Sequence, residues 1–278
     1  MKNKVLPIIS IIILIVAAGL FLYPTVSVWI NQLLSDSAIT QYNNTVDTLS
    51  QTEKSELLSQ AREYNSEVSN VFSDGFDDDS FITDERYNSI LNVTGDGQIG
   101  TVSIPSIDCN LPVYHGSDKD MLTKGAVHMA FTSFPIGGES SHSVISAHTA
   151  YPGKQFFDRL TEVEIGDHFS VTVLGETLNY KVVDIKVVLP SETQYFEVQK
   201  GRDLVTLVTC TPYSVNTHRL LVTGERDCSA TAATEALPET KHFATGFTAL
   251  WCAVPAVAAI SVVTVILIRK RRKRYEAA

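Results

Sequence analysis

The sequence predicts a mainly β fold, a small closed barrel, with an apolar helix at each end of the chain. From Gly97 onward, short β-like runs alternate with turn residues, and about 130 residues of this kind are enough to bury one core. Apolar runs lie near both ends of the 278-residue chain. A polar segment without proline or glycine, residues 31–71, connects the first apolar run to the β-rich part.

The first apolar run, Val5 to Ile30, follows Lys2 and Lys4. At about 1.5 Å per residue, it is long enough to cross a hydrocarbon layer as a helix. No clear small-x-small cleavage site follows the run. We therefore expect residues 1–30 to be an uncleaved transmembrane signal anchor, and a removed signal peptide is the alternative.

The second apolar run, Phe243 to Ile268, is followed at once by the basic residues Arg269 to Arg274. This pattern predicts a transmembrane helix over residues 243–268 and a basic cytoplasmic tail over residues 269–278. Both termini are then cytoplasmic, the part between the two helices is extracellular, and the helices make the lipid bilayer a partner of the chain.

The charge of the chain is divided unevenly. Of the 22 Lys and Arg residues, 8 lie in the basic flanks of the two apolar runs, whereas 30 of the 31 Asp and Glu residues lie between those flanks. The part between the flanks therefore has a net charge of −16. Such an acidic domain argues against nucleic acid or an anionic surface as a partner.

Residues 31–95 are predicted to form a helical stalk followed by a loop. Ser50 and Glu53 have the spacing of a capping box, so a helix is expected to begin there. Four residues recur at helical spacing and are expected to pack on the domain beyond: Leu57, Ala61, Tyr64 and Val68.

The barrel is expected over residues 96–228, with a linker over residues 229–242. Leu174-Gly175-Glu176-Thr177 is a predicted hairpin turn. The predicted strands are Gln98 to Pro105, Leu111 to Tyr114, Ser143 to Ser146, His168 to Leu174, Leu178 to Leu189, Leu204 to Cys210 and Arg219 to Gly224.

Polar side chains that could perform chemistry lie at the ends of these strands. Cys210 follows an apolar run, and Pro212 then ends strand geometry, while Arg219 begins the next run. His148 follows another apolar strand in the same way, whereas His142 is expected on the surface beside two serines. A nucleophilic cysteine needs a base and a group that stabilises an oxyanion, which His148 and Arg219 could supply. A structural cysteine beside an exposed arginine is the alternative.

Four cysteines are present, and Cys252 lies inside the second apolar run. The odd set of three that remains suggests at least one free thiol. Cys109 and Cys228 could form a disulfide, or both could be small buried apolar residues.

Three segments around the candidate residues strongly resemble sortases, the cysteine transpeptidases of Gram-positive cell surfaces: Ser146-Ala147-His148, Thr206 to Tyr213, and Asn216 to Leu221. Further segments extend the resemblance over about residues 90 to 227 and make it one to class C, the pilus-building branch: Ile104 to Ile107, Leu111 to Gly116, Thr132 to Gly138, and Val187 to Pro190.

The resemblance implies an eight-stranded sortase β-barrel with Cys210 as nucleophile, His148 as general acid and base, and Arg219 as the group that stabilises the oxyanion and positions the substrate. Thr209 would help to position the substrate, or it is an ordinary strand residue. No cofactor and no metal site is implied.

The implied substrate is a pilin or surface protein with an LPxTG-like sorting signal, cleaved between Thr and Gly. The acyl-enzyme would be resolved by an amine, for class C a pilin lysine. One alternative is a sortase that anchors surface proteins to the peptidoglycan cross-bridge. A remote alternative is a non-enzymatic surface protein with its own sorting signal.

Two departures from the class C pattern carry further predictions. Where class C sortases commonly have a lid with an Asp-Pro-aromatic motif, this chain has Asp74-Gly75-Phe76. We expect Asp74 to pair with Arg219 and Phe76 to cover Cys210, and a disordered acidic loop is the alternative. Leu237-Pro238-Glu239-Thr240-Lys241 has the order of a sorting signal, with lysine in place of glycine, which raises the possibility that the chain is itself processed.

Overall fold

The structure, a computed structural model, describes residues 5–68, 85–116 and 120–229. Residues 24–232 form one compact unit. The predicted lid residues Asp74 and Phe76, the Leu237–Lys241 motif and the second apolar run all lie outside the described residues.

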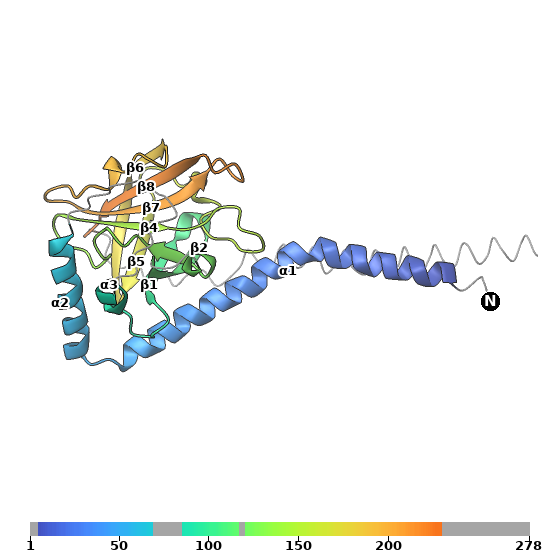
Figure 1. The fold of residues 1–278 in the computed structure, drawn as a ribbon, viewed down its shortest axis with the longest axis horizontal. Coiled ribbons are helices and arrows are strands. Elements are labelled where there is room, and N and C mark those ends of the chain that lie inside the picture. The colour runs from blue at the N-terminus through green and yellow to red at the C-terminus, as the bar shows by residue number, and fades with distance from the viewer. Residues whose placement is uncertain (1–4, 69–84, 117–119, 230–278) are drawn as a thin grey trace, which may run out of the picture. The chain divides into compact units, whose positions relative to one another are not determined.

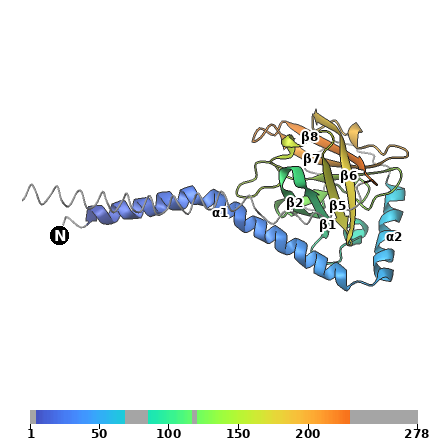
Figure 2. The same ribbon diagram turned by 180° about the vertical axis from the view of Figure 1, so that it is seen from behind.

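Eight strands form a closed barrel, which confirms the β-barrel of the predicted fold (Figures 1 and 2). Around the barrel the order is β1-β2-β3-β4-β7-β8-β6-β5. All seven predicted strands are present, and β3 was not predicted. The strands are β1 Gln98–Ile104, β2 Cys109–His115, β3 Ala126–His128, β4 Ser141–Ser146, β5 His168–Val173, β6 Glu176–Val188, β7 Asp203–Thr211 and β8 His218–Arg226.

The predicted hairpin turn joins β5 to β6. Val173 pairs with Glu176 across a two-residue loop, in which Leu174 and Gly175 have φ angles of 50° and 85°. Two successive residues with positive φ are typical of the tight turn whose twist matches that of antiparallel strands. Glycine at the second position adopts this conformation without steric strain.

The direction of the strands places the candidate site at one end of the barrel. β4 and β7 are parallel neighbours, so both strands end at the same edge. β8 is antiparallel to β7 and begins at that edge. The ends of β4 and β7 and the start of β8 therefore lie side by side.

Apolar side chains fill both faces of these three strands. Ile145, Leu207 and Leu220 belong to the large core inside the barrel. Their neighbours along the chain pack on the opposite face against Phe196, in a second, smaller cluster: Val144, Val208 and Leu221. Because side chains alternate between the two faces of a strand, the strands that carry the candidate site are packed with apolar side chains on both faces.

Helix α1, Val5–Thr48, continues well beyond the apolar run. It is the one helix, within the part of the chain that the structure describes, that is long and apolar enough to cross a membrane. Its last turns pack on the barrel, where Tyr42 and Val46 are buried. The Tyr42 hydroxyl donates a hydrogen bond to the Ile99 carbonyl (2.8 Å) and accepts one from the Leu174 amide (3.1 Å).

Helix α2, Gln51–Glu67, begins at the predicted capping box. The Glu53 amide donates to Ser50 Oγ, and the Ser50 amide donates to the Glu53 carboxylate. Two of its residues, Leu58 and Ala61, are buried. Leu57 and Tyr64 pack against the same core, whereas Val68 ends the helix as its C-cap.

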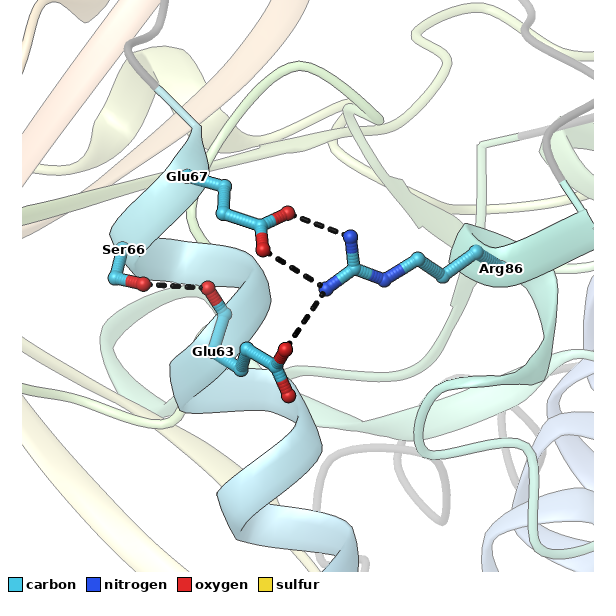
Figure 3. Close-up of polar contacts among 4 residues, drawn as sticks. All are labelled: Glu63, Ser66, Glu67 and Arg86. Carbon is cyan, nitrogen blue, oxygen red and sulfur yellow. Dashed lines mark hydrogen bonds and ion pairs between the residues drawn. The ribbon is translucent and has the colours of Figure 1, made fainter.

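Helix α3, Glu85–Ser89, is tied to the end of α2 by ion pairs (Figure 3). Arg86 contacts the carboxylate of Glu67 at 2.5 Å and that of Glu63 at 3.7 Å. These side chains are about half exposed, so the pairs contribute little net stability. They do hold together the two helices that flank residues 69–84.

The expected surface position of His142 was wrong, and neither alternative left open for Cys109 and Cys228 holds for both residues. His142 is buried, not on the surface, because it belongs to β4 and pairs with β7. Its Nδ1 lies 3.0 Å from the Glu197 carbonyl oxygen and its Nε2 lies 2.8 Å from the Thr206 hydroxyl. Cys109 and Cys228 form no disulfide, and only Cys109 is buried, while Cys228 is exposed.

Candidate active site

Cys210 and Arg219 face one another across two paired strands. Cys210 is the eighth residue of β7, and the antiparallel register pairs it with Arg219 on β8. The Arg219 guanidinium donates two hydrogen bonds of 3.3 Å, to the carbonyls of Asn216 and His218. These carbonyls anchor the guanidinium to the turn that joins the two strands.

His148 reaches the same place from the other side of β7. The β4–β7 register pairs Ser146 with Val208, and the ladder continues with a hydrogen bond from the Ala147 amide to the Val208 carbonyl (3.1 Å). His148 comes two residues after Ser146, and Cys210 comes two residues after Val208. Both residues therefore lie where the two parallel strands end.

The three side chains also share a face of the sheet. Leu207, Leu220 and Ala147 belong to the core inside the barrel. Because side chains alternate along a strand, Cys210 and Arg219 lie on the opposite face, and His148, next to Ala147, follows the same alternation. The side chains of Cys210, Arg219 and His148 are all partly exposed, as substrate access requires.

Thr209 connects the two strand ends that carry the cysteine and the histidine. Its side chain is buried, and its hydroxyl donates a hydrogen bond of 2.8 Å to the carbonyl of Ala147. The contact fixes the end of β7 to the residue that precedes His148. Thr209 therefore helps to fix the positions of Cys210 and His148 relative to one another, although its own side chain is buried in the barrel.

The loop after β4 places the ring of Tyr151 against His148. The rings of His148 and Tyr151 are stacked, with 5.2 Å between centroids and 27° between planes. The carbonyl of His148 accepts a hydrogen bond from the Phe157 amide (3.1 Å). Burial lowers the pKa of His148 below its usual value, because an imidazolium loses hydration in such surroundings.

Asp158 fixes the shape of this loop. Its carboxylate oxygens accept hydrogen bonds of 2.9 Å from the amides of Ala150 and Phe156. Ala150 has a positive φ of 57°, a conformation that a non-glycine residue holds only when its surroundings enforce it. Sequence reasoning did not single out Tyr151 or Asp158, because neither residue lies at the end of an apolar strand.

The arrangement suits acyl transfer. A thiol, an imidazole and a guanidinium lie at the ends of three adjacent strands, and the guanidinium offers donors with a permanent charge. No group of three or more histidine, cysteine or acidic side chains that could bind a metal is found among the described residues.

Comparison with known proteins decides the family. The sequence profile of the sortase domain matches residues 102–227, which contain all three residues. The crystal structure of sortase C-1 from Streptococcus pneumoniae is 37% identical to this chain, with a TM-score of 0.63, over 69% of this chain and 98% of that one. The chain belongs to the sortase family.

The predicted resemblance to class C sortases is confirmed by a second solved structure. A pilus-related sortase C of Group B Streptococcus is 40% identical to this sortase, with a TM-score of 0.61, over 66% of this chain and 94% of that one.

Curated relatives match over a shorter part. Sortase D of Bacillus subtilis is 30% identical over 133 residues, which are 48% of this chain and 64% of that protein. Sortase A of Streptococcus agalactiae is 28% identical over 130 residues, 46% of this chain and 52% of that protein. This sortase therefore spans about half to two thirds of the length of these relatives.

Proposed function

We propose that this sortase is a membrane-anchored cysteine transpeptidase that cleaves LPxTG-like sorting signals between Thr and Gly and joins the Thr carbonyl to an amine. The observation that supports the proposal best is the register, which pairs Cys210 with Arg219 while the parallel β4 brings His148 to the same edge. Residues 96–228 are then the catalytic domain.

The reaction proceeds in two acyl transfers. The Cys210 thiolate attacks the Thr carbonyl carbon, and Arg219 stabilises the negative charge that forms on the oxygen. The Thr–Gly bond breaks when His148 donates a proton to the leaving amine, which leaves a thioester on Cys210. An incoming amine then loses a proton to His148 and attacks the thioester, which expels the Cys210 thiolate and forms a new amide.

The incoming amine is proposed to be a pilin lysine, so that successive reactions polymerise a pilus. The similarity to a pilus-related sortase C supports this choice over the peptidoglycan cross-bridge. Tyr213 and Val215, which are 63% and 62% exposed, lie in the turn between Cys210 and Arg219. They offer apolar surface beside the thiol for the leucine and proline of a sorting signal.

The proposed topology follows the apolar helix. Residues 1–30 anchor the enzyme, residues 31–95 form the stalk and lid, and residues 243–268 span the membrane a second time, so that both termini are cytoplasmic and the catalytic domain is extracellular. One long apolar helix among the described residues supports the first of these spans. The lid roles of Asp74 and Phe76 stay predictions.

The proposal is tested by trapping the acyl-enzyme. The full-length protein in detergent is incubated with an LPxTG peptide, and intact mass spectrometry followed by peptide mapping locates the adduct. We expect one acyl group on Cys210, retained in Cys228→Ala and absent in Cys210→Ala. Cys228 is the matched control because it is a free, exposed thiol. An adduct on Cys228, or none on Cys210 with any sorting-type peptide, would refute the proposal.

A further inference from the structure

A groove separates helix α1 from the barrel near the site. It encloses about 190 Å³, and no Asp or Glu is among the described residues that line it. Carboxylates are otherwise abundant in this acidic chain. Six residues form the part of the groove that matters here: Val28, Asn31 and Gln32 on α1, and Lys124, Lys154 and Phe156 on the barrel side.

Direct contacts fix α1 against the loop that carries His148. The carbonyl of Gly153 accepts hydrogen bonds from Asn31 Nδ2 (2.9 Å) and Ser27 Oγ (3.3 Å). A Cβ atom on Gly153 would lie 2.3 Å from Ser27 Oγ, and the φ of this glycine is +73°. The two hydrogen bonds hold the helix against the loop, and glycine adopts this positive φ without steric strain.

With the first membrane span proposed above, the groove is expected to lie where the helix leaves the membrane. A hydrocarbon core of about 30 Å is crossed by about 20 helical residues, and 20 residues from Val5 end at Pro24. The next two turns therefore lie at the level of the lipid headgroups. Tyr23 and Trp29, which are 67% and 41% exposed, are the side chains that favour this level.

The two lysines give the groove a positive charge at that level. Lys154 donates a hydrogen bond to the Thr123 carbonyl, and its Nζ lies 5.8 Å from the centroid of each of the rings of Tyr151 and Phe156. Lys124, next to Thr123, is exposed. Neither lysine forms an ion pair with a carboxylate in the described part of the chain. An ammonium has three donors, so Lys154 keeps hydrogen-bonding capacity for a further acceptor.

We propose that this groove binds the headgroup of an anionic phospholipid, with Lys124 and Lys154 contacting the phosphate and the side-chain amide of Gln32 contacting the polar headgroup. The proposal rests on the membrane anchoring proposed above. Its consequence concerns catalysis: Lys154 and Gly153 belong to the same loop as His148 and Tyr151. Lipid binding therefore holds the His148 loop at the membrane surface, where a membrane-anchored substrate presents its sorting signal.

The test counts bound lipids. The full-length protein in detergent is equilibrated with equal amounts of phosphatidylglycerol and phosphatidylcholine, and retained lipids are identified by native mass spectrometry. We expect preferential retention of phosphatidylglycerol, and about a tenfold weaker retention when Lys124→Gln and Lys154→Gln are combined. The matched control combines Lys54→Gln on α2 with Lys181→Gln on β6, which makes the same change of charge outside the groove, and should retain lipid as the unaltered protein does.

Three outcomes would overturn the proposal. They are equal retention of the two lipids, the same loss in both pairs of variants, and binding of inorganic phosphate in place of phosphatidylglycerol when both are supplied. Acyl-enzyme formation is measured on the same samples with a soluble peptide. In the unaltered protein, absence of acylation with intact lipid selectivity would refute the transpeptidase proposal alone, whereas absence of selectivity with intact acylation would refute the lipid site alone.

Discussion

At the level of single residues, we expect that lysine cannot replace Arg219 in stabilising the oxyanion. Its guanidinium is held by two carbonyls of the turn, and it lies in register with Cys210. Arg219→Lys keeps the charge but loses the forked donors. We expect the rate of acyl-enzyme formation to fall about 10²-fold, as when one oxyanion donor is removed, measured in single turnovers with a peptide.

The control for this substitution is Arg202→Lys. Arg202 precedes β7 at its other end, where it pairs with Glu225 on β8. The same conservative change far from the thiol should leave the rate within about twofold, because exposed ion pairs contribute little. Equal rates for the two lysine variants would contradict the role given to Arg219.

Tyr151 is the residue that sets the surroundings of His148. Its ring stacks on the imidazole, and burial lowers the pKa of that imidazole. Tyr151→Ala should admit water to one face of the ring, so the pKa of His148 should rise toward its ordinary value of about 6.5. NMR titration of the His148 ring protons measures the change, with Tyr23→Ala, an exposed tyrosine on α1, as the control. An unaltered or lower pKa in Tyr151→Ala would show that other groups bury the imidazole.

His142 shows why single-residue burial was harder to predict than the position of the site. The sequence indicates the strand ends at His148, Cys210 and Arg219, because an apolar run ends beside the first two residues and begins beside Arg219. His142 follows two serines, which resemble a loop, yet its partners are Glu197 and Thr206. Both partners are more than 50 positions away, and local pattern contains no information about them.

Between elements, the end of β4 is held to the end of β7 by a side-chain contact as well as by the ladder. Thr209→Val removes the hydroxyl that donates to the Ala147 carbonyl and leaves a buried acceptor unpaired. We expect unfolding free energy to fall by about 1–3 kcal/mol and acylation to slow, because His148 and Cys210 lose their fixed spacing. Urea denaturation and single-turnover acylation measure the two effects.

Thr209→Ser is the matched variant because it keeps the hydroxyl. It should restore the acylation rate even where loss of the methyl group lowers stability. A Ser variant that is as slow as the Val variant would mean that the hydrogen bond does not position the site.

Elements differed in how well the sequence predicted them. The seven longer strands show alternation or continuous apolar runs, and all are present. β3 has three residues, too few to establish a period. Docking of α1 was also not predicted, since it depends on Tyr42 reaching Ile99 on β1 and Leu174 in the turn between β5 and β6. Contacts between distant segments follow from the closed barrel and not from local sequence.

For the whole molecule, buried histidines link stability to pH. In the part of the chain that the structure describes, His115, His128 and His142 are buried. Burial lowers the pKa of each one, and for His128 the value falls to about 3. In the unfolded chain a histidine titrates near about 6.5. At pH values between the pKa of a buried histidine in the folded state and its pKa in the unfolded state, the unfolded state binds more protons than the folded state. The free energy of unfolding therefore decreases as pH falls below about 6.5.

His128 should account for a measurable part of that loss. Its Nδ1 lies 3.0 Å from the Tyr87 hydroxyl and its Nε2 lies 2.9 Å from the Ser133 carbonyl oxygen. His128→Gln keeps polar groups near both partners but cannot titrate. Between about pH 6 and pH 4, the unfolding free energy should therefore fall less steeply in this variant, by about 1.4 kcal/mol per pH unit.

Urea denaturation of the full-length protein in detergent at several pH values gives the slope. Equal slopes for the unaltered protein and His128→Gln would mean that His128 is protonated in the folded state.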